Sequence, residues 1–259
     1  MSTLLIIVIT IIFTAISMLI ILNFVTGEKK IQRKLGQQYS IHDPQFGRSV
    51  SALLSPAFIA GNDVKVLTNG NKIFPEMLKA IRGAKQTITF ETFIYWGDSI
   101  GEEFANALIE RVQTGVKVHV LLDWLGSIKM EQQQLDKMQR VGVKIERYHK
   151  PHWSHLARLN NRTHRKLLII DGKVGFTGGV GIADQWRGDA QNPNEWRDTH
   201  FLVHGPVVGQ MQAVFMDNWI KSKGSVLHDE RYFQELKKQA ICPLKCLVAR
   251  RVVGETLWC

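Results

Sequence analysis

The residues best suited to chemistry lie in one short run, Thr163-His164-Arg165-Lys166-Leu167-Leu168-Ile169-Ile170-Asp171-Gly172. Because side chains at positions i and i+2 of a β-strand share a face, we expect His164 and Lys166 to point the same way. A neutral imidazole can attack phosphorus, and a neighbouring ammonium can stabilise the charge on the non-bridging oxygens. The pair therefore predicts phosphoryl transfer with no metal ion and no cofactor, with His164 as nucleophile and Lys166 as phosphate ligand.

Two further features belong to this run. Asp171 has the opposite parity and begins an Asp-Gly turn, so we include it in the catalytic motif but expect a structural role. Gly178 and Gly179 follow a predicted strand, and successive glycines let backbone N–H groups approach a phosphate closely. The alternatives are a surface His beside a solvated Lys, and an ordinary glycine turn.

Alternating strand and helix patterns surround the motif and must position it. The predicted strands cover residues 64–67, 86–96, 116–123, 143–148, 166–171, 173–177 and 200–203. The predicted helices cover residues 73–84, 99–114, 130–141 and 207–220. We expect Asn71 to cap the first of these helices, and Ser99 to cap the second in a capping box with Glu102. This alternation predicts an α/β lobe, with a mixed sheet flanked by helices.

An uncharged apolar segment occupies residues 4–25. As a helix it is long enough to cross a bilayer core of about 30 Å. Lys29, Lys30, Arg33 and Lys34 follow it, so the positive-inside rule predicts a single-pass anchor in the inner membrane with the lobe on the cytoplasmic side. A cleaved signal peptide is the alternative, but the basic n-region, short apolar run and small-residue cleavage site are absent. The predicted organisation is an anchor (1–28), a juxtamembrane linker (29–61), a catalytic lobe (62–225) and a tail (226–259).

The composition favours an anionic partner. The net charge is +10, which suits phospholipid head groups, a membrane surface or nucleic acid. Part of this charge is a basic run over residues 144–173, which has eight Lys and Arg against two acidic residues. The three cysteines, Cys242, Cys246 and Cys259, match no zinc spacing and no disulfide framework.

Together, His164-x-Lys166-x4-Asp171-x6-Gly178-Gly179 resembles the signature of the phospholipase D superfamily. Residues 90–94, 120–127 and 196–200 resemble the cardiolipin synthase branch, and the likeness covers about 62–225. It implies that a phosphatidyl group passes from one phosphatidylglycerol to another through a phosphohistidine, with release of glycerol. In relatives an acid some thirty residues downstream orients the nucleophilic His, which makes Asp198 the candidate here and Glu195 the second choice.

The chain departs from the family pattern in two ways. Gly181 stands where the family often has Asn, and there is one motif where superfamily enzymes pair two. A second half-site must come from an identical chain, in a homodimer, or be absent. The segment from Ala240 fits no element of the lobe, so we hypothesise a truncated or frame-shifted copy of a two-lobe enzyme. The alternatives to phosphatidyl transfer are a single-motif homodimeric phosphodiesterase or nuclease, and an inactive phosphate-binding membrane protein. The anchor makes nucleic acid the less favoured partner.

Overall fold

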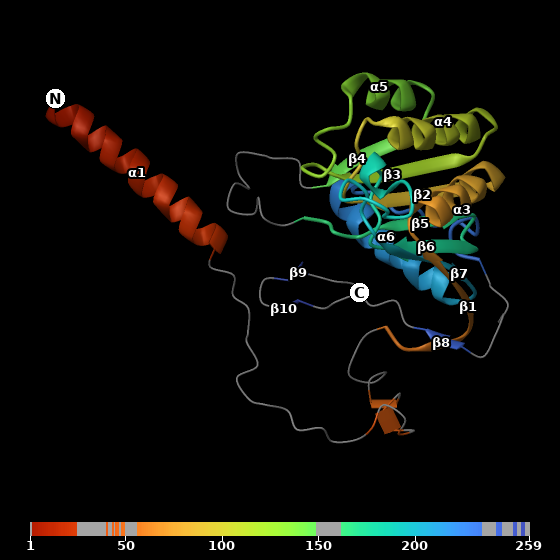
Figure 1. The fold of residues 1–259 in the computed structure, drawn as a ribbon. Coiled ribbons are helices and arrows are strands. Elements are labelled where there is room, and N and C mark those ends of the chain that lie inside the picture. Colours follow the sequence, from red (N-terminus) through yellow and green to blue (C-terminus); the bar gives the residue numbers. More distant parts are fainter. Residues whose placement is uncertain are drawn as a thin grey trace.

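The computed structural model describes residues 2–24, 40, 43, 45–46, 48–49, 56–148, 162–234, 242–244, 251–252 and 255–256 (Figure 1). The helices are α1 (Thr3–Phe24), α3 (Gly70–Gly83), α4 (Ser99–Gln113), α5 (Gln132–Arg140), α6 (Val207–Lys223) and the 3-10 turn η2 (Asp184–Trp186). The strands are β1 (Ile59–Thr68), β2 (Thr87–Thr92), β3 (Lys117–Asp123), β4 (Lys144–Tyr148), β5 (Leu167–Ile170), β6 (Val174–Gly178), β7 (Thr199–His204), β8 (Cys242–Leu244), β9 (Arg251–Val252) and β10 (Glu255–Thr256).

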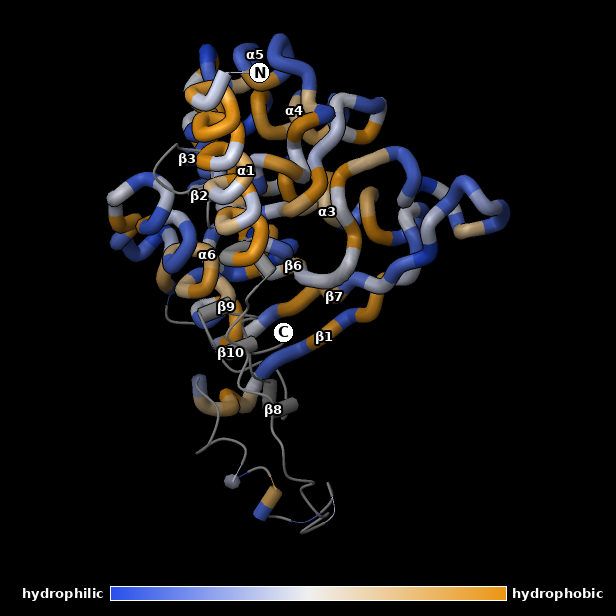
Figure 2. Tube along the Cα trace, turned by 90° about the vertical axis from the view of Figure 1, so that its left-hand side faces the viewer, coloured by the Kyte–Doolittle hydropathy of each residue, from blue (hydrophilic) through white to orange (hydrophobic). Residues whose placement is uncertain are grey.

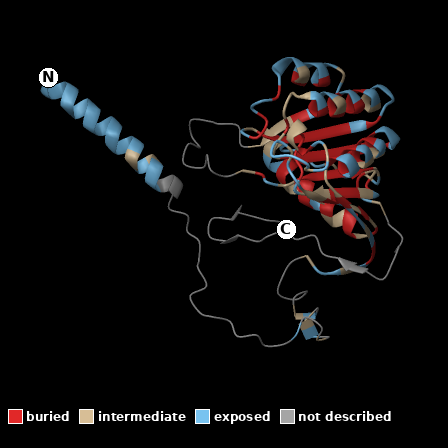
Figure 3. Cartoon of the chain, in the orientation of Figure 1, coloured by how far each residue is buried: buried red, intermediate tan, exposed pale blue. Residues whose placement is uncertain are grey.

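The lobe is built on one mixed sheet, as the alternating pattern predicts. Its strand order is β4-β3-β2-β5-β6-β7-β1-β8. β2, β3 and β4 are parallel to one another, whereas β5, β6, β7 and β1 form antiparallel pairs. Helices α3 and α4 cover one face of the sheet and α6 covers the other, so the strands between them are buried (Figures 1 and 3). The strand that follows the His-Lys pair, β5, lies in the middle of this sheet.

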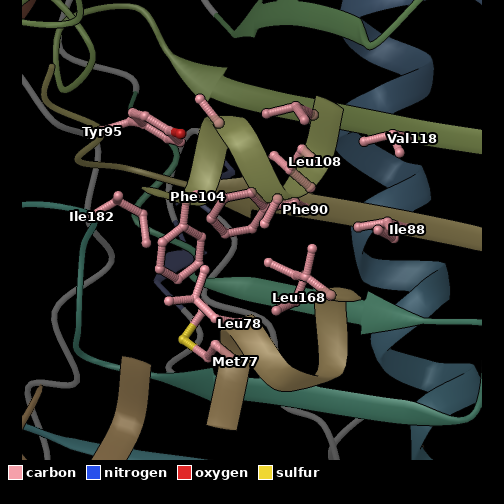
Figure 4. Close-up of a cluster of buried hydrophobic side chains, with 14 of the residues drawn as sticks. Met77, Leu78, Ile88, Phe90, Tyr95, Phe104, Leu108, Val118, Leu168 and Ile182 are labelled. Carbon is pink, nitrogen blue, oxygen red and sulfur yellow. The ribbon is translucent and has the colours of Figure 1, made fainter. Parts of the chain in front are cut away.

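Two apolar cores hold β5 in place. Leu168 and Ile170 pack into the core under α3 and α4, part of which is drawn in Figure 4. Leu167 and Ile169 pack into the core under α6. Burying an aliphatic side chain of this size contributes about 1.5–3 kcal/mol, so these four residues anchor β5 from both faces.

The caps of α3 and α4 differ from the predicted ones by one or two residues. The structure places Asn69 before α3, and Asn71 lies in the first turn of that helix. For α4 the cap is Asp98, whose carboxylate accepts a hydrogen bond from the Gly101 N–H at 3.2 Å, and Ser99 is the first helical residue. Both predictions of the cap residue were therefore wrong, because neighbouring polar residues compete for this position and tertiary contacts decide between them.

The tail contributes to the lobe, contrary to the expectation that the segment from Ala240 fits none of its elements. β8 pairs antiparallel with β1, with Cys242 opposite Asn62. Two residues that precede β8 in the chain also contact the lobe: the carbonyl of Arg231 accepts a hydrogen bond from the Thr87 hydroxyl at 3.0 Å, and Tyr232 is buried. Contacts with the sheet thus continue beyond residue 225, and the division of the chain into four parts stays a prediction.

Helix α1 is apolar along its length (Figure 2), and almost all of its side chains are exposed as far as Ile21. It is the one helix in the described part of the chain that is long and apolar enough to span a membrane. A signal sequence near the N-terminus can pass the same test of length and composition, so membrane anchoring is taken up below as a proposal.

Candidate active site

His164 and Lys166 lie immediately before β5, and the structure brings their side chains together. Lys166 Nζ is 3.1 Å from His164 Nδ1 and 3.2 Å from Nε2. The same ammonium donates to the His164 carbonyl at 3.2 Å. His164 is exposed, whereas Lys166 is 9% exposed. A ligand arriving from solvent would therefore meet the imidazole with a positive charge directly beside it.

The surroundings favour the charge states that phosphoryl transfer requires. Although His164 is open to solvent on one side, the protein atoms packed around the rest of the ring lower the pKa of its imidazole. The charge of Lys166 lowers this pKa further, and the carboxylate of Asp123 opposes both effects. Burial lowers the pKa of Lys166 to about 8, against the opposing field of Asp198. At pH 7 a group whose pKa lies below 6.5 is mainly neutral and an amine with a pKa of about 8 is mainly charged, so the pair combines a free lone pair with a positive charge.

Phe93 forms one wall of the site. Its ring centroid lies 4.8 Å from that of His164, and Lys166 Nζ lies 5.8 Å from the same ring. A Cβ atom on Gly126 would collide with the Phe93 carbonyl oxygen, so the loop after β3 packs directly on the segment after β2. Phe93 and Gly126 lie in the segments 90–94 and 120–127 that resemble the cardiolipin synthase branch, but the sequence analysis assigned no role to either residue.

The glycine pair lies at the end of β6, beside the His-Lys pair. A Cβ atom on Gly178 would lie 2.5 Å from His200 Nδ1, and one on Gly179 would collide with the Asp198 carboxylate. The Gly179 N–H donates to the Thr199 carbonyl at 3.2 Å. These glycines therefore make room for two neighbouring side chains, and phosphate binding by the Gly179 amide would require its sheet hydrogen bond to open.

The Asp198 carboxylate lies next to Gly179, and its charge acts on the Lys166 ammonium. Its carboxylate accepts hydrogen bonds from the Thr199 N–H at 2.8 Å and from Trp186 Nε1 at 3.1 Å. Among the residues that the structure describes, none of its hydrogen bonds goes to His164. In this conformation Asp198 acts on Lys166 through its charge.

Glu195, the second-choice orienting acid, is placed elsewhere. Its carboxylate accepts from the Gln191 N–H at 3.0 Å and from Asn192 Nδ2 at 2.7 Å, which closes its own loop. The structure therefore does not bring Glu195 to the His-Lys pair.

Asp171 lies at the opposite end of β5 from His164. It adopts φ +52° and Gly172 adopts φ +62°, as in the type I′ hairpin turn that an Asp-Gly pair predicts. Its carboxylate accepts the backbone N–H groups of Lys85, Gln86 and Thr87 at 2.9, 2.7 and 2.8 Å. The acid of the motif thus ties the start of β2 to the β5–β6 turn, and it does not reach the imidazole.

Asp123, which the sequence reasoning gave no role, supports the site from the end of β3. This buried carboxylate accepts the N–H groups of Leu125 and Gly126 through one oxygen, and the N–H of Thr163 through the other at 3.1 Å. An acid at the end of a hydrophobic strand is the signal that could have identified it. His200 is a second unpredicted neighbour: it is buried on β7, and burial lowers its pKa to about 3, with a smaller contribution from Lys166.

Three exposed apolar side chains, called the apolar rim below, lie on the segments after β3 and before β7, which also carry residues near the site. The rim consists of Leu125, Ile128 and Trp196, which are 44%, 61% and 42% exposed. Leu125 adjoins the glycine that packs on Phe93, and the Trp196 ring is 4.7 Å from Trp186, the donor to Asp198. Apolar side chains beside a cationic centre suit a ligand with a charged head and an apolar body.

Part of the basic run over residues 144–173 lies outside the described residues, since residues 149–161 are not among them. In the described part of the chain, no group of three or more His, Cys, Asp or Glu residues is arranged to hold a metal ion.

Comparison with known proteins gives a consistent result. The family model described as "Cardiolipin synthase, PLD-like domain", where PLD stands for phospholipase D, matches residues 77–219, which is more than half of the chain. Cardiolipin synthase 1 of Bacillus cereus is 38% identical over 158 residues, covering 60% of this chain and 31% of that protein. Cardiolipin synthase A of Pseudomonas syringae is 36% identical over 173 residues, covering 66% and 36%. The chain thus spans about a third of the length of these relatives.

The phosphatidylserine synthase of Haemophilus influenzae has a similar fold. Its structure matches with a TM-score of 0.51 at 15% identity, and the match covers 74% of this chain and 44% of that one. At this identity the likeness concerns the fold alone. The family match over residues 77–219 leads to one assignment: the chain belongs to the cardiolipin synthase family of phospholipase D-like domains.

Proposed function

We propose that this lobe transfers a phosphatidyl group between phospholipids through a phosphohistidine at His164, converting two phosphatidylglycerol molecules into cardiolipin and glycerol. The observation that carries the proposal is the exposed His164 imidazole with Lys166 Nζ 3.1 Å from its ring, in a chain of the cardiolipin synthase family. For phosphatidyl transfer, one half-site must supply a nucleophile and a group that stabilises the negative charge on phosphate.

The reaction has two displacements. A ring nitrogen of His164 attacks the phosphorus of the first phosphatidylglycerol, the bond from phosphorus to the glycerol oxygen breaks, and glycerol leaves with a proton. A hydroxyl of the second phosphatidylglycerol then attacks the phosphohistidine, the N–P bond breaks, and the hydroxyl loses its proton as cardiolipin forms. In both steps Lys166 stabilises the negative charge on the non-bridging oxygens.

The proton for the leaving glycerol must come from a general acid, which then serves as base for the second hydroxyl. We place this group on a second copy of the chain, in a homodimer in which two His164 side chains face each other across one site. The exposure of His164 leaves room for this arrangement.

The membrane completes the proposal. The apolar rim of Leu125, Ile128 and Trp196 suits acyl chains, and the net charge of +10 suits anionic head groups. Helix α1 would anchor the lobe to the inner membrane, with Lys29, Lys30, Arg33 and Lys34 on the cytoplasmic side. Anchoring raises the effective concentration of a substrate that stays in the bilayer.

A phosphodiesterase or nuclease is the second candidate. The same His-Lys pair could cleave a phosphodiester with water as acceptor, and the charge of +10 attracts a polyanion equally well. The apolar rim favours the lipid, because two of its three residues, Leu125 and Ile128, are aliphatic, whereas single-stranded nucleic acid is bound mainly by stacking on aromatic side chains.

The test is to incubate the purified full chain with phosphatidylglycerol vesicles and, separately, with single-stranded DNA. We expect cardiolipin and glycerol in equal amounts, intact DNA, and loss of transfer in His164→Ala, while His228→Ala, an exposed histidine outside the site, behaves as the parent. DNA cleavage without lipid transfer would establish the second candidate. Activity of His164→Ala equal to the parent would refute both, and no activity on either substrate would support a phosphate-binding role without catalysis.

A further inference from the structure

A buried polar cluster lies behind the imidazole, on the α6 side of the sheet. It joins Glu91 on β2, Thr163 just before the nucleophile, and Asn218 on α6, which are 0%, 3% and 3% exposed. The Thr163 hydroxyl donates to Glu91 Oε1, and Asn218 Nδ2 donates to the same oxygen at 2.7 Å. Asn218 Nδ2 also lies 3.2 Å from Thr163 Oγ1. The three side chains therefore form a closed triangle.

This cluster is costly in free energy for the fold. Burial raises the pKa of Glu91, although the charge of Arg165 and the hydrogen bonds from Thr163 and Asn218 oppose the shift. Its second oxygen, Oε2, has no hydrogen-bond partner among the residues that the structure describes. A buried carboxyl carries a desolvation cost, which the two hydrogen bonds to Oε1 offset only in part. Residues that break the local rules in this way are expected at functional sites.

Thr163 is held from two sides. Its hydroxyl is bound by Glu91 on β2, and its N–H donates to Asp123 on β3 at 3.1 Å. The two acids thus lie on adjacent parallel strands and fix both the side chain and the backbone of the residue before His164. In contrast, the His164 ring itself contacts Phe93 and Lys166 and is exposed.

We infer that Glu91 and Asn218 are positioning residues that act through Thr163 to hold the His164 imidazole against Lys166. The inference rests on the proposed function in that His164 is the group whose position matters. Displacing a nucleophile by about 1 Å can lower a rate by about a hundredfold. None of the three residues touches the reacting atoms, so their effect passes through the backbone between Thr163 and His164.

The test compares Thr163→Val with Thr163→Ser in the full chain. Valine keeps the shape of threonine and the N–H to Asp123 but removes the hydroxyl, whereas serine retains it. We expect Thr163→Val to lower kcat for lipid transfer by about ten- to a hundredfold with KM within twofold, and Thr163→Ser to stay near the parent. Thr114→Val, at the exposed end of α4, is the matched control and should leave the rate unchanged.

A second readout does not require catalysis. The pKa of the His164 imidazole is measured by NMR in histidine-labelled protein and assigned with His164→Ala. In the parent it lies below 6.5 because of burial and Lys166, with Asp123 opposing. In Thr163→Val the ring moves away from Lys166, so its pKa rises toward about 6.5, and Thr163→Ser restores the parental value.

Two substitutions at Glu91 distinguish a loss of positioning from a general folding defect. Glu91→Gln keeps an oxygen that accepts from both partners, so its rate should stay within threefold of the parent. Glu91→Leu removes the acceptor and should reproduce the loss of Thr163→Val per folded molecule, although its thermal midpoint should fall because the Thr163 hydroxyl and Asn218 Nδ2 lose their shared acceptor.

The outcomes separate this inference from the proposed function. If the parent transfers no lipid, the proposed function fails, and a shift in the His164 pKa between parent and Thr163→Val still supports the positioning role. If that pKa and kcat are both unchanged in Thr163→Val, the inference is overturned. A loss of activity with an unchanged His164 pKa, not restored by serine, would also overturn it, because that pattern indicates a structural defect.

Discussion

The two ends of β5 carry the two halves of one motif and are built in opposite ways. At the beginning, an exposed imidazole lies beside a buried ammonium, and Lys166 has its pKa lowered to about 8. At the far end, the Asp171 carboxylate accepts three backbone N–H groups and closes a hairpin turn. At the His164 end the imidazole is open to a ligand, whereas at the Asp171 end the carboxylate is already bonded to three backbone N–H groups of the fold.

This difference shows how one sequence signature can combine chemistry with architecture. His164 and Lys166 are two residues apart, so they meet at one end of a strand. Asp171 is separated from them by the length of β5, and its partners lie at the start of β2. The comparison predicts that substitutions at the first end change the rate, and that substitutions at the second change the stability.

The largest effect is expected for Lys166→Gln. Removal of the charge next to the transferred phosphoryl group should lower kcat by about 10²–10³-fold, while the thermal midpoint stays within a few degrees. Steady-state lipid transfer and thermal unfolding measure the two quantities. Lys173→Gln, at the exposed turn after β5, is the matched control. Equal rates for both variants would remove Lys166 from the mechanism.

Asp171→Ala should have the converse effect. Three backbone donors lose their acceptor, so the free energy of unfolding should fall by about 2–4 kcal/mol, and kcat per folded molecule should not change. Denaturant titration gives the first quantity, and transfer rates corrected for the folded fraction give the second. Asp63→Ala, at an exposed position of β1, serves as control. A large fall in kcat at unchanged stability would place Asp171 in the catalytic machinery and break the comparison.

The pH dependence of kcat/KM sharpens the account of the first end. The nucleophile must be neutral, so the rate should fall about tenfold per pH unit below the pKa of His164, which lies under 6.5. Lys166 must be charged, so the rate should also fall above its pKa of about 8. Lys166→Arg should remove the part of the alkaline fall that begins near pH 8, because a guanidinium stays charged there, whereas the fall caused by deprotonation of the general acid on the second copy should persist. An alkaline limb that is the same in parent and Lys166→Arg would belong to another group.

The smallest effect is expected for Gly172→Ala at the second end. Gly172 adopts φ +62°, and a Cβ atom there would lie 2.6 Å from the Tyr232 carbonyl oxygen. The strain should lower the free energy of unfolding by about 1–2 kcal/mol and leave kcat unaltered. Thermal and denaturant unfolding detect such a change, and Gly83→Ala, where nothing lies near the added atom, is the control.

Local patterns were sufficient for much of the fold and for the central pair. The alternation of strands and helices predicts the α/β lobe, and the Asp-Gly dipeptide predicts the hairpin after β5. The two-residue spacing predicts that His164 and Lys166 share a face, and the two side chains do meet, although both residues lie just before β5 and not on it. β2 was predicted to run to residue 96 but ends at Thr92, because the chain turns there and Tyr95 makes only a single bridge to Ile182.

The support around the site could not be predicted, because its partners are distant in sequence. Glu91 and Thr163 are 72 positions apart, and Glu91 and Asn218 are 127 apart. The spacing of glycines suggests phosphate binding, but it cannot show that the side chains of His200 and Asp198 fill the space beside them. Likewise, the distance from Asp198 to the imidazole depends on how β7 lies against β6, which no local pattern encodes.

The most direct test is to look for the phosphohistidine itself. The full chain is mixed with phosphatidylglycerol, quenched within one turnover under alkaline conditions, and digested for mass spectrometry. The account predicts a phosphatidyl adduct on His164 that is labile to acid, disappears when a second phosphatidylglycerol is added, and is absent from His164→Ala. An adduct on another residue, or lipid transfer by His164→Ala at the parental rate, would contradict it.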